Sequence, residues 1–488
     1  MGLNPKRSSS EDGVPNMVDL VRPDFLYGAR HTQAILLFLL ITISYGMRVN
    51  LSVGIVAMTD PDASPNPDVP TYSWDDTNVI LSSFFWGYVI PQIPAGQLAK
   101  EYGPKWFLAG SSAVGAAFTI LIPFAAPLGS WAVILCRVIQ GLSQGFIYPS
   151  CHNLLSKWTP LEERSRLSTF VYAGGPFGTV LALPFSGWLS GTSLGWPYAF
   201  YIYGVLGFLW TGMWIFLGEN SPADCNSINP IEKKYIEVSV GHSKHLSPPP
   251  TPWKPIFTSL PMIALIIAHS GQDWGFSTLL TNIPTYMENV LNVDIKSNGL
   301  LSAGPYFAFW VLSFVFSAIT DYVISKKYVS TVVARKVANS IGVFVPAAAL
   351  TALGLISNLD FDVSAITILL LFIAVGVNAC CYCGYQVNHM DLSPIHSGTL
   401  MGISNGISNI FAIIAPLILQ FIVTDEKNPL QWATIFYISS GVYIGTNIFY
   451  IIFGSGEIQP WNDVNYKTTH NRNIEKVMDT SSVITYRC

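Results

Sequence analysis

Long apolar runs alternate with short polar stretches along almost the whole chain. An α-helix needs about 20 residues to cross the ~30 Å hydrocarbon core of a bilayer, and many of the runs reach that length. The pattern predicts an all-α integral membrane protein with twelve transmembrane helices, near 31–58, 76–98, 104–125, 130–155, 166–191, 196–217, 258–285, 297–321, 335–357, 363–388, 397–423 and 432–455.

The widest polar gap between the predicted spans, at residues 218–257, divides them into two sets of six. It includes the stretch "HLSPPPTP", a composition typical of loops. Two six-helix bundles related by pseudo-symmetry are a common plan of transporters. We therefore expect an N-terminal tail at 1–30, bundles at 31–217 and 258–455, a central loop at 218–257 and a C-terminal tail at 456–488.

Composition and charge support a multi-pass membrane protein and orient it in the bilayer. Half of the residues are hydrophobic and 11% are charged, whereas soluble proteins carry about 25% charged residues. If both termini are cytoplasmic, 21 of the 25 Lys and Arg residues lie inside, two lie in outer loops and two lie within helices. Cytoplasmic loops of membrane proteins carry such an excess of positive charge. The polar start of the chain does not resemble a signal peptide, and no basic block indicates a nucleic-acid partner.

Other functional classes find little support in the sequence. An integral-membrane enzyme would need a cluster of His, Asp or Ser at one membrane level, and none stands out. A transporter-fold sensor without transport would carry a larger soluble domain than the tails and central loop provide. The stretch "CCYC", at 380–383, lacks the second ligand pair of a metal site. We expect a monomeric carrier with no enzymatic activity, cofactor or resident metal.

The two cations inside helices, Arg48 and Arg137, are the leading candidates for a binding site. At ~1.5 Å per residue, Arg48 lies about 21 Å from the inner edge of the hydrocarbon and Arg137 about 9 Å from the outer edge. Both therefore lie at one level, where a charge costs roughly 2.5–3.5 kcal/mol and usually faces a partner or water. They either bind an anion or hydrogen-bond to neighbouring helices and hold the bundle together.

Polar side chains repeat at helical spacing around both arginines and in two helices of the second half. The predicted substrate site comprises Arg48, Arg137, Tyr45, Ser52, Gln140, Gln144, Tyr148, Gln272 and Asn405. The predicted coupling-ion site comprises Asp273, His269, Ser408 and Asn409. The predicted inner gate comprises Asp321, Arg164 and Arg166. The alternative is that these residues are only charges at the membrane interface.

Several motifs, taken in order, resemble one family: "RVNLSVGIVAM", "RVIQGLSQG", "GYQVNHMDLSP" and "GTLMGISNGISN". The chain resembles the anion:cation symporter branch of the major facilitator superfamily, which includes sialin, the vesicular glutamate transporters and the sodium–phosphate cotransporters. The resemblance implies the major facilitator fold and transport of a small anion by alternating access. It also implies that Arg48 contacts the acidic group of the substrate and that Arg137 belongs to a central polar network. Between the second and third spans, Lys100 stands where the superfamily usually has an aspartate.

Three departures from relatives narrow the expected substrate and coupling ion. Proton-coupled, sialin-like relatives carry glutamates where this chain has Gln140 and Gln144. Glutamate carriers have a histidine where Leu81 stands and an arginine where Gln272 stands. The chain therefore resembles the phosphate and organic-anion branch more closely, with Asp273 as the candidate ligand of a coupling cation. We expect Na⁺-coupled anion uptake at the plasma membrane. The alternative is a voltage-driven or H⁺-coupled organic anion carrier in a vesicular or lysosomal membrane.

Overall fold

The computed structural model describes residues 27–463 apart from 62, 75, 241–248, 291–294, 358–363 and 426, and the described part is helical without strands. The first half contains α1 (Ala29–Thr59), α2 (Thr77–Val89), α3 (Gln92–Tyr102), α4 (Lys105–Ala125), η2 (Ala126–Leu128), α5 (Ser130–Gln144), α6 (Ile147–Trp158), η3 (Leu161–Glu163), α7 (Arg164–Tyr172), α8 (Gly174–Ser190) and α9 (Pro197–Leu217). The remainder contains α10 (Pro230–Val240), α11 (Trp253–Thr258), α12 (Leu260–Asn289), α13 (Ile295–Ser325), α14 (Thr331–Ile356), α15 (Ser364–Gly376), η4 (Val377–Cys383), α16 (Tyr385–Leu392), α17 (Ser397–Ile422), α18 (Pro429–Phe453) and η5 (Pro460–Asn462). Most of the predicted tails, 1–30 and 456–488, falls outside the described residues.

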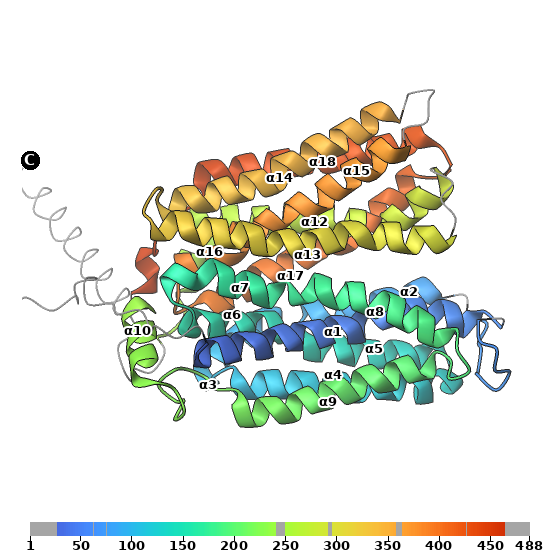
Figure 1. Cartoon of the computed structure of the whole chain (residues 1–488), viewed down its shortest axis with the longest axis horizontal. Helices are drawn as coiled ribbons and strands as arrows, with labels where there is room; N and C mark the ends of the chain where they lie inside the picture. The colour runs from blue at the N-terminus through green and yellow to red at the C-terminus, as the bar shows by residue number, and fades with distance from the viewer. Residues whose placement is uncertain are drawn as a thin grey trace, which may run out of the picture.

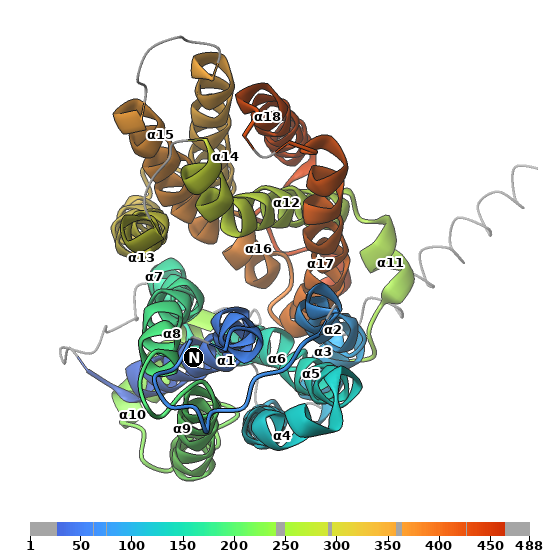
Figure 2. The same cartoon turned by 90° about the vertical axis from the view of Figure 1, so that its right-hand side faces the viewer.

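The helices pack in two groups that lie side by side (Figures 1 and 2). Helices α1 to α9 form the lower group in Figure 1, and α12 to α18 form the upper group. Buried apolar side chains fill each group, including Trp158 and Trp214 in the first and Leu350 and Tyr443 in the second. This is the arrangement of two helical bundles that the sequence predicts.

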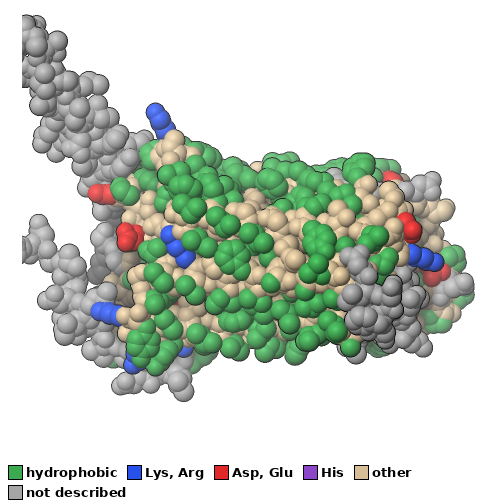
Figure 3. Space-filling view, turned by 90° about the horizontal axis from the view of Figure 1, so that it is seen from above, with side chains coloured by type: hydrophobic (Ala, Val, Ile, Leu, Met, Phe, Trp, Pro, Cys, Tyr) green, Lys and Arg blue, Asp and Glu red, His purple; other side chains and the backbone are tan. Residues whose placement is uncertain are grey.

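The helices have the length and composition of membrane spans. Nine of those described are long and apolar enough to cross a bilayer, or ten if the bent pair Val79–Val89 and Gln92–Tyr102 is one span. All twelve predicted spans are helical, but two do not pass this test. One is split at Ala173 into helices of 9 and 17 residues, and the other, α12, carries the polar run "HSGQD". Figure 3 shows hydrophobic side chains along the visible face and charged side chains towards its ends.

Close helix contact shapes the centre of the first group. A β-carbon at Gly87 of α2 would lie 2.0 Å from the carbonyl oxygen of Val138 in α5. A β-carbon at Gly141 of α5 would lie 2.0 Å from the carbonyl oxygen of Phe84. Small residues allow two helix backbones to approach in this way. The contact brings the buried ring of Phe84 to the middle of the group.

The central segment, predicted as a loop, contains the helices α10 and α11. Glu232 of α10 accepts hydrogen bonds from the backbone N–H of Ala29, at 2.9 Å, and from Arg30 Nη1, at 2.8 Å. Arg30 also pairs with Glu163 at 2.8 Å. A carboxylate at the first turn of α1 is favoured by the helix dipole. The loop prediction missed this helix because its anchoring contacts come from a distant part of the sequence.

Candidate functional site

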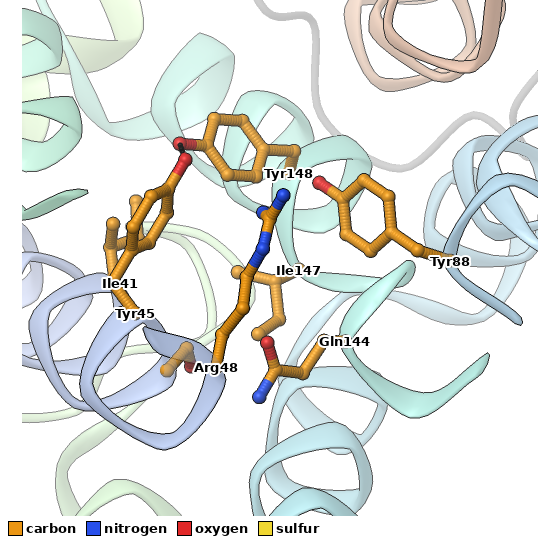
Figure 4. Close-up of a pocket in the computed structure, with 8 residues that line it drawn as sticks. Ile41, Tyr45, Arg48, Tyr88, Gln144, Ile147 and Tyr148 are labelled. Atoms are coloured by element: carbon orange, nitrogen blue, oxygen red, sulfur yellow. Dashed lines mark hydrogen bonds between the residues drawn. The ribbon is translucent and has the colours of Figure 1, made fainter. Parts of the chain in front are cut away.

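Arg48 lies in the middle of α1 and faces a small cavity (Figure 4). The cavity is lined by Ile41, Ser44, Tyr45, Arg48, Tyr88, Gln144, Ile147 and Tyr148. The guanidinium carbon of Arg48 lies 4.5–5.5 Å from the ring centroids of Phe85, Phe84, Tyr45 and Tyr88. Arg48 is partly exposed and has no hydrogen bond or ion pair with any other described residue. The aromatic faces stabilise its charge and leave its N–H donors free for a ligand.

Further donors in the cavity lack partners. Ser44 Oγ and Gln144 Nε2 are buried and have no hydrogen-bond partner among the described residues. Leaving a buried polar group unsatisfied costs about 1–3 kcal/mol, so such groups normally meet a ligand or water. The hydroxyls of Tyr45 and Tyr148 share a hydrogen bond of 3.2 Å at the cavity wall. A cation and several donors in one small cavity form a suitable site for an anion.

Arg137 and Gln140 lie behind this cavity rather than in its lining. Arg137 is buried, and its Nη1 donates to Gln140 Oε1 at 2.6 Å. Gln140 Nε2 donates to Thr119 Oγ1 at 2.7 Å and to the Met47 carbonyl at 3.2 Å. The amide therefore ties three helices together, which is the structural alternative left open by the sequence. Both polar atoms of the Gln140 amide are therefore bonded within the protein in this structure.

The two arginines nevertheless belong to one cluster. The guanidinium carbon of Arg137 lies 5.0 Å from the Phe84 ring centroid, and that of Arg48 lies 4.8 Å from the same centroid. The shared ring places both cations at one level of the bundle, as their depths in the sequence predict. Arg137 therefore adds positive potential to the cavity without lining it.

Three other residues of the predicted substrate site lie outside the cavity lining. Ser52 is exposed one turn beyond Arg48. Gln272 exchanges hydrogen bonds with Asn378, including one of 2.9 Å from Asn378 Nδ2 to Gln272 Oε1. Asn405 donates to the Tyr88 hydroxyl at 3.2 Å and so reaches the cavity wall from the second group.

Two residues with hydroxyl groups that line the cavity, Ser44 and Tyr88, are absent from the predicted site. The spacing of four residues between Ser44 and Arg48 was the available sequence signal for the first. Tyr88 lies on α2 within an apolar run, so no local pattern marked it.

Three of the four predicted coupling-ion residues lie together. Asp273 Oδ2 accepts a hydrogen bond of 2.6 Å from Ser408 Oγ and lies 3.8 Å from His269 Nε2. The Asp273 side chain is 24% exposed, so it also faces open space. Asn409 instead donates to the Asn405 carbonyl at 2.7 Å. A carboxylate and hydroxyl oxygens are ligands that hard cations accept.

A hydrogen-bonded path begins at His269, next to this acid, and leads to α16. His269 Nδ1 lies 3.1 Å from Ser404 Oγ, and the same oxygen lies 2.6 Å from His389 Nε2. His389 lies fully buried in α16. The path connects His269 to His389 through side chains of three helices, and Asp273 lies 3.8 Å from its first residue.

The predicted gate residues are brought together at one end of the molecule. The backbone N–H of Arg166 donates to Asp321 at 2.7 Å, which joins the two helix groups. Arg164 pairs with Asp391 at 3.1 Å, and Arg335 pairs with the same carboxylate at 2.6 Å. The predicted gate omits Asp391 and Arg335, because their contacts with each other and with Arg164 join segments that are distant in the sequence.

The gate contacts close one end of the molecule. Among the described residues, the hydrogen bonds that join the two helix groups lie either at the Tyr88–Asn405 contact or further towards this end. The closed end is the one that carries most of the Lys and Arg residues. The structure therefore shows a state in which this end is shut.

The chain is similar to known membrane transporters in both sequence and fold. A family model described as Major Facilitator Superfamily matches residues 36–416. The chain is 40% identical over 468 residues to a Drosophila melanogaster protein named "Putative inorganic phosphate cotransporter", covering 91% of this chain and 88% of that protein. It is 35% identical over 455 residues to Homo sapiens sialin, covering 89% and 90% of the two chains. Its fold is similar to that of the proton:xylose symporter XylE, with a TM-score of 0.67, 13% identity and coverage of 89% and 99%.

Proposed function

The chain belongs to the major facilitator superfamily, and we propose that it takes up inorganic phosphate by alternating access, coupled to Na⁺. The observation that carries the proposal is the Arg48 guanidinium, which faces a cavity without a hydrogen-bonding partner. Ser44 and Gln144 add unpartnered donors to the same cavity. The oxygens of a phosphate accept the paired N–H bonds of the arginine fork and further bonds from these donors.

The names of the relatives bear on the identity of the anion. The phosphate cotransporter name among the relatives supports phosphate over a sugar acid. The positive potential of Arg137 behind the cavity strengthens the attraction for either anion.

The proposed coupling follows from the work that uptake requires. An anion entering a cell moves against the membrane potential, at about 2.3 kcal/mol per charge per 100 mV. Co-transported cations remove this cost. Asp273 and the Ser408 hydroxyl provide oxygen ligands beside open space, so we place the Na⁺ there.

Proton coupling is the second candidate, and one observation favours it. The side chains of Asp273, His269, Ser404 and His389 form an array through which a proton could pass from carboxylate to imidazole. Histidine is the side chain best suited to proton transfer near neutral pH.

The proposal also assigns an orientation and a membrane. The excess of Lys and Arg favours cytoplasmic termini and a cytoplasmic central segment. Uptake driven by Na⁺ places the carrier at the plasma membrane, where a Na⁺ gradient is available.

Uptake of labelled phosphate into proteoliposomes tests the proposal. Na⁺ is replaced by choline at fixed pH and voltage, and a pH gradient is then applied without Na⁺. We expect uptake that needs Na⁺ in the wild type and loses Na⁺ dependence in Asp273→Asn. The matched control is Asp68→Asn, which removes an exposed acid from the outer loop.

Each alternative predicts a different outcome. Uptake that ignores Na⁺ but follows the pH gradient supports the proton-coupled candidate. Uptake that responds only to voltage rejects both ions. If the carrier takes up an organic carboxylate but no phosphate, the proposal that phosphate is the substrate is wrong, and the proposal that the protein is an anion carrier stands.

A further inference from the structure

Lys100, near the inner end of α3, is a buried cation without an acidic partner. Its exposed fraction is 8%, and no carboxylate of the described residues lies within ion-pair distance of its Nζ. The ammonium donates to the Pro249 carbonyl at 2.6 Å and to Thr251 Oγ1 at 2.7 Å. Buried lysines are normally paired with a negative charge. The surroundings of Lys100 therefore lack one.

The contacts of Lys100 hold a short segment that we call the strap, residues 249–252. Gln97, one turn before Lys100, donates from Nε2 to Thr251 Oγ1 at 2.6 Å. The strap leads directly into α11 and α12 of the second group, whereas α3 belongs to the first. These hydrogen bonds therefore join the two groups at the closed inner end, and they must break when that end opens.

A third neighbour, His396, does not offset the charge of Lys100. It lies between α16 and α17, with Nδ1 at 3.5 Å from Lys100 Nζ. Burial, together with the neighbouring Lys100 charge, lowers the pKa of His396 to about 3. The ring is therefore neutral at cytoplasmic pH and accepts a hydrogen bond without supplying a negative charge.

The sequence of the strap is a modification motif. Thr251 is half-buried, follows three prolines and precedes Pro252. Proline restricts the preceding residue to extended conformations, and an extended Thr-Pro pair is the form that proline-directed kinases accept. We propose that Thr251 is a phosphorylation site and that its phosphate pairs with Lys100 to hold the inner end shut. The proposal rests on the proposed orientation, which places the strap in the cytoplasm.

The chemistry is a phosphoryl transfer from ATP. A bond forms between the terminal phosphorus and Thr251 Oγ1, the phosphoanhydride bond breaks, ADP leaves with the bonding electrons, and the hydroxyl proton passes to the base of the kinase. The product carries a charge of about −1.5 to −2. Lys100 already lies 2.7 Å from this oxygen, so an ion pair replaces a neutral acceptor.

Access to the site depends on the transport cycle. In the closed state the Thr251 hydroxyl is held by Lys100 and Gln97, so a kinase reaches it only when the inner end opens and the strap leaves α3. On return, the phosphate meets Lys100 and makes the next opening less frequent. Phosphorylation therefore slows transport.

The test uses the full-length carrier in proteoliposomes, treated with a proline-directed kinase and ATP on the strap side. Mass spectrometry measures phosphate on Thr251, and hydrogen exchange measures the opening of α3 and of α11, because Thr251 carries the only backbone N–H of the strap. Exchange requires no knowledge of the substrate, so its result stays distinct from failure of the proposed function. We expect exchange in the wild type to slow by roughly fivefold, the scale of one partly exposed ion pair.

Two variants make the result decisive. Lys100→Met removes the charge and keeps the length, and we expect it to accept phosphate on Thr251 without slower exchange. Thr251→Val accepts no phosphate there and shows no kinase effect. If Thr251 stays unmodified even in Lys100→Met, where the strap is released, the site is wrong. If phosphate leaves exchange unchanged or speeds it in the wild type, the pairing with Lys100 is wrong.

Discussion

Replacing Arg48 tests the binding site directly, because this side chain forms no hydrogen bond or ion pair with the described part of the protein. The fold loses only its contacts with neighbouring aromatic rings, each worth about 0.5–1 kcal/mol at an exposed site. A bound anion, in contrast, loses the group that holds it. Arg48→Ala should therefore reduce binding far more than stability.

The size of the loss follows from the arginine fork. A hydrogen bond to a charged group contributes about 1.5–3 kcal/mol, so a two-bond fork contributes ~3–6 kcal/mol. Each 1.4 kcal/mol is a factor of about ten in affinity. We expect Arg48→Ala to weaken phosphate binding by about 10²–10⁴-fold. Arg48→Lys keeps the charge without the planar fork, and it should recover only part of that loss.

The assay measures equilibrium binding of labelled phosphate to purified carrier, together with the melting temperature of each variant. Arg335→Ala is the matched control, because Arg335 is buried and pairs with Asp391 at 2.6 Å. Removing one partner of a buried pair costs about 3–5 kcal/mol. The control should therefore lower the melting temperature clearly, whereas Arg48→Ala should not.

Two results would refute the reasoning about Arg48. One is a folded Arg48→Ala carrier that binds phosphate as tightly as the wild type. The other is a melting temperature that falls as far as that of Arg335→Ala, which would make Arg48 a structural tie. If Arg48→Lys binds phosphate as tightly as the wild type, the positive charge is required but the two-bond geometry of the arginine fork is not.

Three further predictions concern orientation, gate and packing. Epitope tags in 59–73 should be accessible on intact cells, and tags in 218–257 only after permeabilisation; labelling of 218–257 on intact cells would reverse the orientation. Asp391→Asn leaves two buried arginines without a carboxylate, so the melting temperature in detergent should fall by the equivalent of about 3–5 kcal/mol; an unchanged value would contradict the ion-pair account. Gly87→Ala places a β-carbon 2.0 Å from a main-chain oxygen of α5, so size-exclusion chromatography should show little monodisperse protein, and a normal yield would show that the helices can separate.

The sequence predicted the helices well because the requirement for crossing a bilayer is local. A run of apolar residues of sufficient length must be helical in lipid, whatever it packs against. Breaks within the spans were less visible. The bend of 42° between α2 and α3 has a local cause in Pro91, but the 3₁₀ segment Val377–Cys383 lies in a stretch that reads as ordinary helix.

Part of the candidate site could also be predicted locally. Tyr45 and Arg48 are close in sequence on one helix, and Gln144 and Tyr148 lie four residues apart. Helical spacing puts such residues on one face, and all four line the cavity. Depth in the membrane, which follows from counting residues, placed the arginines at one level.

The partners of these side chains were decided only by the tertiary structure. Gln140 and Gln144 are one turn apart and look alike in the sequence. The amide of Gln140 is bonded to groups on α1 and α4, whereas Gln144 Nε2 has no described partner and faces the cavity.

The contacts of Asp391 and of Lys100 were also decided only by the tertiary structure, because the partners of both residues lie in distant segments of the chain. Hydrophobic length and helical spacing are properties of neighbours along the chain, so the sequence alone determined the helices and the faces they present. A hydrogen bond or ion pair depends on which helices meet and at what distance. Those distances exist only once the two groups of helices have packed together.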